Sequence, residues 1–244
     1  MIRALLWDLD GTLLNFKAAE AAAIRSLFKD FGFGPCTDEM IRTYARINDA
    51  YWKKLERGEM AKPEILVRRF ADFFAGEGLD SAQAPAFNQR YQLALGDTIV
   101  FCDEGDRIVQ DLKGKIPQYG VTNGTLAAQT KKLERSGLGE LFDGVFISDQ
   151  IGYEKPDVRF FAPVFAQLAE DIPGITKDEV LIIGDSLTSD MLGGIRAGIR
   201  TCWYHPVEEQ GAATAGQDEA HQMAIDHEIQ DLHEIYGILG MNQK

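Results

Sequence analysis

The chain has 244 residues, of which 45% are apolar and 26% charged, and its formal net charge is −13. This length allows a full hydrophobic core, or one core domain with a smaller domain inserted. A surface this acidic repels nucleic-acid backbones and anionic membranes, so neither is an expected partner. A protein this acidic can still bind a small phosphorylated metabolite, provided that a local cation or a bound metal reverses the field.

Cysteine usage and the first residues bear on the compartment. Cys36, Cys102 and Cys202 are scattered and form no C-x-x-C pair, which argues against a disulfide framework or a zinc site and suits a reducing cytosol. Acidic residues follow the N-terminus too closely for a signal peptide, and no apolar run approaches the roughly 20 residues that span a bilayer. We therefore expect a cytoplasmic protein, whose oligomeric state the sequence leaves open.

The chain opens with a predicted strand and continues into helices. Residues 2–9 form an apolar run without alternation, which is typical of a strand buried on both faces, and Asp10-Gly11-Thr12 then predicts a turn. From about residue 16 to residue 100 no strand is convincing. Helices are predicted there at 17–31, 38–57, 63–75 and 81–95. The simplest interpretation is an all-helical insertion after the first strand.

Strands and helices alternate in the rest of the chain. The apolar runs that predict strands are 119–122, 144–148, 180–184 and 200–204, and the helical patterns between them are 126–136, 157–170 and 189–197. Gly137 and Gly198 stand where C-terminal helix caps belong. This alternation predicts an α/β fold with a parallel sheet and helices on both faces. Residues 206–224 predict a surface loop, followed by a short strand near 227–229 and a helix near 231–239.

Polar residues follow the predicted strands, where open parallel sheets carry their ligand sites. Four segments deliver them: Asp8 and Asp10; Thr122, Asn123 and Gly124; Lys155 and Pro156; and Gly184, Asp185, Ser186 and Asp190. Each segment alone is an ordinary turn or helix start, but the four together, in this order, indicate one site. Crowded carboxylates repel one another, and Mg²⁺ with oxygen ligands is the natural way to neutralise them. Lys155 and the Thr122 hydroxyl add phosphate-binding groups beside a carboxylate nucleophile.

Other candidate sites are weaker. The four histidines form no i, i+4 metal-binding pair and are expected at the surface: His205, His221, His227 and His233. Neither a G-x-G-x-x-G nor a G-x-x-x-x-G-K-[ST] motif is present, so a nucleotide-cofactor fold is unsupported.

The four segments resemble, in order, the motifs of the haloacid dehalogenase superfamily: Asp8-Leu9-Asp10-Gly11-Thr12-Leu13, Thr122-Asn123-Gly124, Lys155-Pro156-Asp157 and Gly184-Asp185-Ser186-Leu187-Thr188-Ser189-Asp190. The resemblance spans about residues 1–205. It implies a Rossmann-like three-layer core with a parallel sheet, built from residues 1–15 and 101–244. It also implies an all-helical cap domain formed by residues 16–100.

The resemblance also implies roles. Asp8 would attack phosphorus and form an aspartyl-phosphate, and Asp10 would protonate the leaving oxygen and then activate water. Thr122 and Lys155 would bind the phosphoryl oxygens. The implied Mg²⁺ ligands are the Asp8 side chain, the Asp10 backbone carbonyl, Asp185 and Asp190.

A second resemblance bears on the substrate. Four short segments look like those of pyrimidine nucleoside 5′-monophosphatases: Arg46-Ile47-Asn48 with Trp52, Glu56-Arg57-Gly58, Gly193-Gly194 and Trp203-Tyr204. The predicted substrate-binding residues are Asn123 and, in the helical insertion, Phe16, Asn48 and Trp52. Hinges are expected near residues 15–16 and 101–105. Closure of the insertion would cover the leaving group and exclude water.

Several alternatives remain open at this point. The four motifs also fit a sugar-phosphate phosphatase or a β-phosphoglucomutase-like enzyme. A 2-haloacid dehalogenase would need the nucleophile but no metal, so the additional aspartates disfavour it. A non-catalytic binding protein would usually have lost Asp8, Asp10 or Lys155, all of which are present.

Overall fold

The computed structural model describes residues 1–206 and 223–241, and its centre is a six-stranded sheet. The strands run in the order β3-β2-β1-β4-β5-β6, and every neighbouring pair is parallel. Their bounds are β1 (Ala4–Trp7), β2 (Gln118–Thr122), β3 (Gly144–Ile147), β4 (Val180–Gly184), β5 (Arg200–Tyr204) and β6 (His227–Ile229). The predicted strands are therefore present, although the first is shorter than the apolar run 2–9.

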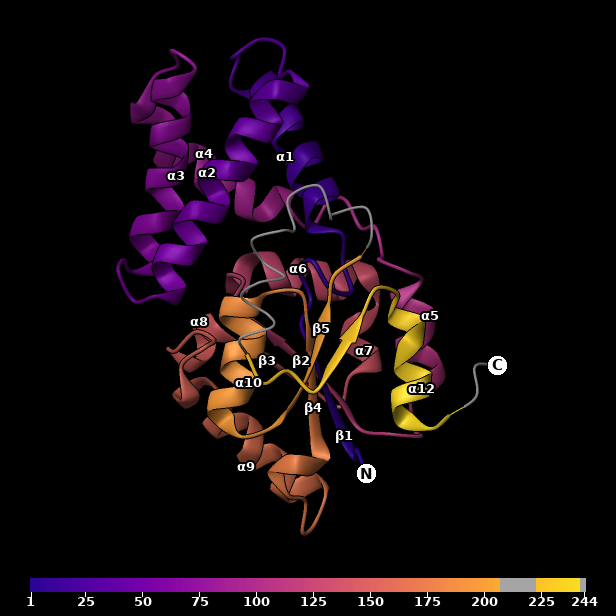
Figure 1. The fold of residues 1–244 in the computed structure, drawn as a ribbon. Coiled ribbons are helices and arrows are strands. Elements are labelled where there is room, and N and C mark those ends of the chain that lie inside the picture. The colour runs from indigo at the N-terminus through magenta and orange to yellow at the C-terminus, as the bar shows by residue number, and fades with distance from the viewer. Residues whose placement is uncertain (207–222, 242–244) are drawn as a thin grey trace. The chain divides into compact units, whose positions relative to one another are not determined.

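Helices cover both faces of this sheet, so the core is a three-layer α/β sandwich, as predicted (Figure 1). The helices of this part of the chain are α5 (Gly105–Leu112), α7 (Leu138–Leu141), α8 (Ser148–Ile151), α9 (Phe161–Asp171), α10 (Leu192–Ala197) and α12 (Ile235–Leu239). Ala4 and Leu6 of β1 belong to a buried cluster with residues of α9. Successive strand residues point to opposite faces, so both faces of β1 are buried.

Short elements account for most differences from the predicted helices. Residues 157–170 divide into a 3₁₀ turn, η2 (Val158–Phe160), and α9, and residues 189–197 into a π-helix, η4 (Leu187–Met191), and α10. Helices α5, α7 and α8 were not predicted. Two of these span only four residues each, which is too short for a helical period to be visible in the sequence.

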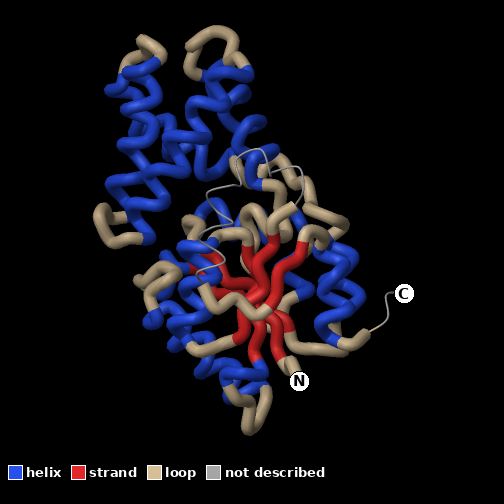
Figure 2. The backbone as a smooth tube through the Cα atoms, viewed as in Figure 1, coloured by secondary structure: helices blue, strands red, loops and turns tan. Residues whose placement is uncertain are grey.

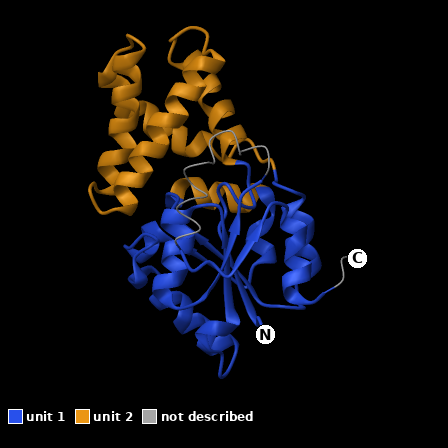
Figure 3. Cartoon of the chain, viewed as in Figure 1, with its two compact units in different colours: residues 1–15, 101–126, 136–244 blue, residues 16–100, 127–135 orange. Residues whose placement is uncertain are grey.

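The chain forms two compact units (Figure 3). Unit 1 contains residues 1–15, 101–126 and 136–244 and carries the sheet; unit 2 contains residues 16–100 and 127–135. The segment 127–135 belongs to α6 (Leu126–Ser136), which had been predicted as part of the α/β alternation. Its Ala128 packs into the core of unit 2, which explains the grouping.

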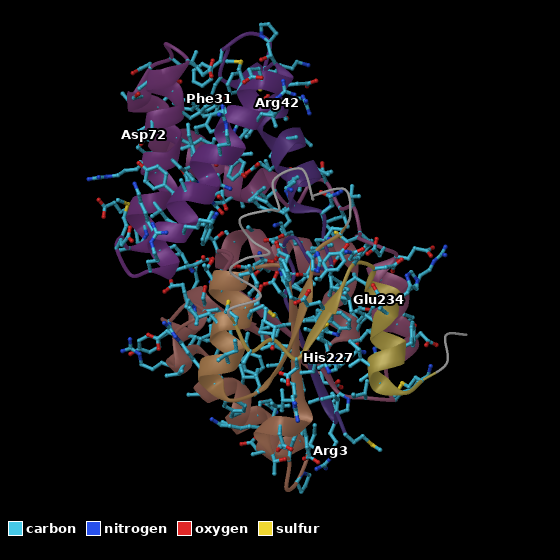
Figure 4. All side chains as sticks on the ribbon, in the orientation of Figure 1. Arg3, Phe31, Arg42, Asp72, His227 and Glu234 are labelled. Atoms are coloured by element: carbon cyan, nitrogen blue, oxygen red, sulfur yellow. The ribbon has the colours of Figure 1, made fainter. Side chains whose placement is uncertain are left out.

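The regular elements of unit 2 are all helices, and loops and turns join them (Figure 2). Besides α6 its elements are α1 (Phe16–Asp30), α2 (Asp38–Glu56), α3 (Lys62–Gly76), the 3₁₀ turn η1 (Ser81–Gln83) and α4 (Ala84–Ala94). Aromatic rings fill its core: Phe28, Tyr44, Phe70, Phe73, Phe74, Phe87 and Tyr91 are fully buried. Phe31, labelled in Figure 4, packs at the margin of this core, 5.0 Å from Phe87 between ring centroids.

The chain returns to unit 1 through an unusual loop. Asp103 and Glu104 have φ angles of 42° and 55°, in the left-handed region that non-glycine residues seldom occupy. The Asp103 carboxylate accepts hydrogen bonds from the Tyr204 hydroxyl at 2.8 Å and from the Leu232 backbone N–H at 3.1 Å. These bonds hold the loop in place against its backbone preference.

Two further expectations concern the rest of the chain. Most of the predicted surface loop at 206–224, with His221, lies outside the described residues. Among the helices described, none has both the length and the apolar character that crossing a bilayer requires.

Candidate active site

The strand order places the candidate site. Strand β1 lies between β2 and β4. From β1 the strand order runs one way through β2 and β3, and the other way through β4, β5 and β6. Ligands of open parallel sheets bind outside the carboxyl ends of the strands at such a reversal. Asp8 follows β1 directly, and its backbone N–H bonds to the Ile183 carbonyl of β4 at 2.9 Å. The nucleophile candidate therefore stands where this fold binds its ligands.

The loop after Asp8 folds tightly around Gly11. Leu14 N–H bonds to the Leu9 carbonyl and Gly11 N–H to the Leu14 carbonyl, both at 2.8 Å. Gly11 has a φ of +98°, and a Cβ atom there would lie 2.4 Å from the Asp185 carboxylate. Only glycine fits this position without displacing Asp185.

Lys155 joins two buried carboxylates. Its Nζ atom, on a side chain that is 1% exposed, donates to Asp8 Oδ1 at 2.7 Å, to Asp190 Oδ1 at 2.6 Å and to the Val121 carbonyl at 2.8 Å. Burial raises the pKa of Asp8 to about 7, although the Lys155 charge acts in the opposite direction. Burial disfavours the Lys155 charge, but Asp190 and Asp8 together hold its pKa above the ordinary value.

Asn123 organises the Lys155 loop. Its Nδ2 donates to the Lys155 carbonyl at 2.8 Å and to Ser189 Oγ at 3.2 Å, while its Oδ1 accepts the Lys155 backbone N–H at 2.8 Å. Both ends of the side-chain amide are thus occupied by protein groups, so the substrate contact predicted for Asn123 would fall to its backbone N–H. Thr122, at the end of β2, is buried, and its hydroxyl accepts the Gly124 backbone N–H at 3.1 Å.

Asp190 lies on the π-helix η4, a type of turn that is frequent at functional sites. Its carboxylate accepts the Ser186 backbone N–H at 3.2 Å. It also occupies the space beside Gly184, where a Cβ would approach its Cγ to 2.3 Å. The glycine at the end of β4 therefore makes room for this buried acid.

Three carboxylates gather here as a metal site would require. Ligand oxygens of Asp8, Asp185 and Asp190 all lie within 4.8 Å of one another. The Thr12 hydroxyl lies 3.4 Å from oxygens of both Asp8 and Asp185. The donors are carboxylate oxygens, the hard ligands that Mg²⁺ prefers, so this donor set fits Mg²⁺. Asp10 is half-buried and outside this cluster, and only its backbone carbonyl had been assigned to the metal.

Asn48 lies inside unit 2. It is 4% exposed, its Nδ2 donates to Glu20 Oε1 at 2.9 Å, and its Oδ1 accepts from Arg69 at 2.6 Å. The Tyr91 hydroxyl also donates to Glu20 Oε1, at 3.3 Å. Burial raises the pKa of Glu20 to about 7, against the opposing effects of Arg69, Tyr91 and Asn48. With its amide committed to this buried network, Asn48 is not free to read a base as predicted.

The other two residues predicted from the helical insertion remain candidates. Phe16 is half-buried, and the Lys132 ammonium lies 5.2 Å from its ring centroid. Trp52 is half-buried beside a small cluster of Tyr51, Leu55 and Ile65. Sequence reasoning missed Thr12 and Trp203 as members of the site. Thr12 had a visible signal within the Asp8–Thr12 motif, whereas Trp203 meets Asp185 only through the pairing of β4 with β5.

Comparison of the sequence with known proteins bears on the family to which the chain belongs. Residues 5–204 match the family described as haloacid dehalogenase-like hydrolase. YfnB of Bacillus subtilis (strain 168), which bears a HAD-hydrolase name, is 35% identical over 98% of this chain and 96% of its own. The pyrimidine 5′-nucleotidase PynA of Streptococcus pneumoniae (strain ATCC BAA-255 / R6) is 38% identical, over 83% of each chain.

Solved structures agree. A crystal structure of YfnB bound to magnesium superimposes with a TM-score of 0.86, at 35% identity, and covers 98% of this chain and 99% of that one. This likeness extends over the sheet unit and the helical unit alike. The chain therefore belongs to the haloacid dehalogenase-like hydrolase family.

Proposed function

We propose that this chain is a Mg²⁺-dependent phosphomonoester hydrolase and that its substrates are pyrimidine nucleoside 5′-monophosphates. One observation carries the phosphatase assignment. A buried carboxylate, Asp8, is bonded to the Lys155 ammonium at 2.7 Å, and two further acids have oxygens within 4.8 Å of it. A carboxylate nucleophile paired with a fixed cation beside a hard-metal site is suited to phosphoryl transfer.

Asp8 would attack phosphorus in line, so that an Asp8 Oδ–P bond forms while the bond from phosphorus to the leaving oxygen breaks. Asp10 would give its proton to that leaving oxygen. Asp10 would then take a proton from a water molecule that attacks the aspartyl-phosphate, which restores Asp8 and releases inorganic phosphate. Lys155 would stabilise charge on the phosphoryl oxygens, and its bonds to Asp8 and Asp190 keep it in place for this.

The proposed metal ligands are Asp8, the Asp10 backbone carbonyl, Asp185 and Asp190. Bound Mg²⁺ supplies Lewis-acid charge that offsets these carboxylates and the phosphate together. Thr12, buried between Asp8 and Asp185, would keep the two carboxylates apart and oriented. Gly11 and Gly184 would preserve the space that the acids occupy.

The substrate assignment rests on similarity to PynA, which is named a pyrimidine 5′-nucleotidase. Groups that bind a phosphoryl group do not distinguish one leaving group from another, so we assign that choice to residues of unit 2. Phe16 and Trp52 are the proposed contacts, because a half-buried aromatic ring can stack on a planar base. Asn48 is no longer among them.

A panel of phosphomonoesters tests both levels of the proposal. With Mg²⁺ present, kcat/KM is expected to be highest for uracil and thymine nucleoside 5′-monophosphates, and lower for purine nucleotides and hexose phosphates. A clear preference for a hexose phosphate would refute the nucleotidase assignment and leave the phosphatase standing. Isomerisation of a sugar phosphate in the presence of a bisphosphate activator would instead identify a mutase. Halide release from a 2-haloacid without metal would refute phosphoryl chemistry.

A further inference from the structure

Trp203 contacts the backbone of Asp185, one of the proposed metal ligands. Strand β5 pairs with β4 so that Trp203 lies opposite Gly184, one residue before Asp185. The indole Nε1–H donates to the Asp185 carbonyl at 2.9 Å. The Trp203 side chain of β5 thus binds the backbone of Asp185, which directly follows the neighbouring strand β4.

The indole itself is held firmly. Trp203 is 7% exposed and belongs to the buried cluster that contains Ile182 and Met191. Its ring stacks on that of His205, with the centroids 4.0 Å apart and the planes at 27°. The His205 backbone N–H bonds in turn to the Ile229 carbonyl of β6 at 3.0 Å. Packing on one side and a stacked ring that is anchored to the sheet leave the N–H little freedom to move away from Asp185.

This contact has a consequence for the Asp185 carboxylate. Only two rotatable bonds, Cα–Cβ and Cβ–Cγ, separate that carboxylate from its own backbone. A fixed carbonyl at residue 185 therefore restricts where the carboxylate oxygens can lie. Their observed position is close to Asp8 and Asp190, near Thr12 Oγ1, and against the space left by Gly11.

We infer that Trp203 is a positioning residue for the metal site, which orients Asp185 through its backbone carbonyl. The inference rests on the proposed function, because it presumes that Asp185 binds Mg²⁺. Groups that orient metal ligands typically contribute about 10- to 100-fold to metal affinity. Since Trp203 acts through one neutral hydrogen bond to the backbone, we expect an effect near the lower end, roughly tenfold.

Trp203→Phe tests this inference, because it keeps an aromatic ring and removes the N–H donor. Tyr204→Phe is the matched control. Tyr204 is the next residue in the same strand, and its substitution also removes one hydrogen bond of similar length. That bond goes to Asp103 and not to the acidic cluster. MgCl₂ is titrated into each metal-free protein by isothermal titration calorimetry. Trp203→Phe is expected to bind Mg²⁺ about tenfold more weakly, and Tyr204→Phe to bind it like the parent.

Activity measured against Mg²⁺ concentration gives a second readout. The Mg²⁺ concentration for half-maximal activity should rise in Trp203→Phe, while kcat at saturating Mg²⁺ stays close to that of the parent. A loss of kcat without a change in Mg²⁺ affinity would overturn the positioning role. Equal weakening in Tyr204→Phe would do so as well, because it would mark a general loss of stability. If the parent itself binds no Mg²⁺, the metal-dependent function fails, and the inference fails with it.

A measurement on the unmodified chain covers the case in which Trp203→Phe does not fold. The chain has three tryptophans, Trp7, Trp52 and Trp203, so a ¹⁵N-indole-labelled sample gives three side-chain N–H signals. Trp52→Phe and Trp7→Phe assign them by elimination. Added MgCl₂ should shift the Trp203 indole signal. An unmoved Trp203 signal in a sample that binds Mg²⁺ would overturn the inference.

Discussion

Glu20→Gln should remove a pH dependence of stability that originates in the helical unit. Glu20 is 2% exposed, and its Oε1 accepts hydrogen bonds from Asn48 and Tyr91. Glutamine has nearly the same shape and offers the same carbonyl acceptor, but it cannot ionise. The charged groups that act on Glu20 are Arg69 and, more weakly, Lys17. The substitution therefore changes the protonation of one buried group and leaves its packing in place.

The size of the effect follows from the pKa. Burial raises the pKa of Glu20 from 4.5 to about 7 in the folded protein. Between these values the folded state holds a proton that the unfolded state has released. The protonated carboxyl therefore contributes its full stability below pH 4.5, and this contribution is lost as the pH rises through 7. At about 1.4 kcal/mol for each pH unit, the loss is roughly 3 kcal/mol.

Urea unfolding followed by far-UV circular dichroism at pH 5, 6, 7 and 8 measures this contribution. Glu20→Gln should match the parent near pH 5 and exceed its free energy of unfolding by up to roughly 3 kcal/mol at pH 8. Glu134→Gln is the control, because Glu134 is an exposed acid of the same unit. The reasoning is refuted if Glu20→Gln keeps the parent's pH dependence, or if Glu134→Gln loses it equally.

Further outcomes test the candidate active site. Chelation of divalent metal should abolish phosphate release and added Mg²⁺ should restore it; full activity after chelation would contradict the proposed metal site. Asp8→Asn should abolish turnover because an amide is a poor nucleophile at phosphorus, whereas Asp10→Asn should slow it about 10²- to 10⁴-fold, as single-turnover kinetics would measure. Lys155→Met should cost about 3–5 kcal/mol of stability without metal, since two buried carboxylates lose their shared cation; an unchanged urea midpoint would contradict this. Gly11→Ala should weaken Mg²⁺ binding in calorimetry, because its Cβ would lie 2.4 Å from Asp185.

The fold followed from sequence where the signals were local. Buried strands show as continuous apolar runs, and the order of the polar segments after them brought Asp8, Lys155, Asp185 and Asp190 to one edge of the sheet. The short helices escaped prediction because a four-residue segment holds barely one turn. The grouping of residues 127–135 with unit 2 depends on packing between segments that are distant in sequence. The hydrophobic periodicity within one segment does not predict such packing.

The substrate-binding predictions show a different limit. An asparagine on a helix has the same sequence signature whether its amide faces a ligand or a buried partner. Asn48 forms hydrogen bonds with Glu20, 28 positions earlier, and with Arg69, 21 positions later. The sequence around Asn48 does not predict either partner. The side-chain amide of Asn123 has partners that are equally distant in sequence, because it bonds to the backbone of Lys155, 32 residues away. A bond to the backbone cannot be predicted from the type of the partner residue, because nearly all residues offer the same backbone groups.

The loop at residues 103–104 gives an opportunity for protein engineering. A left-handed conformation costs a non-glycine residue about 1 kcal/mol or more relative to glycine. Asp103 is compensated by its bonds to Tyr204 and Leu232, whereas Glu104 makes an exposed ion pair with Arg107, and such pairs contribute little. Glu104 is thus the position where glycine relieves backbone strain without removing a buried contact. A thermostabilised scaffold for directed evolution of substrate choice can begin there, because the change leaves every residue of the candidate active site untouched.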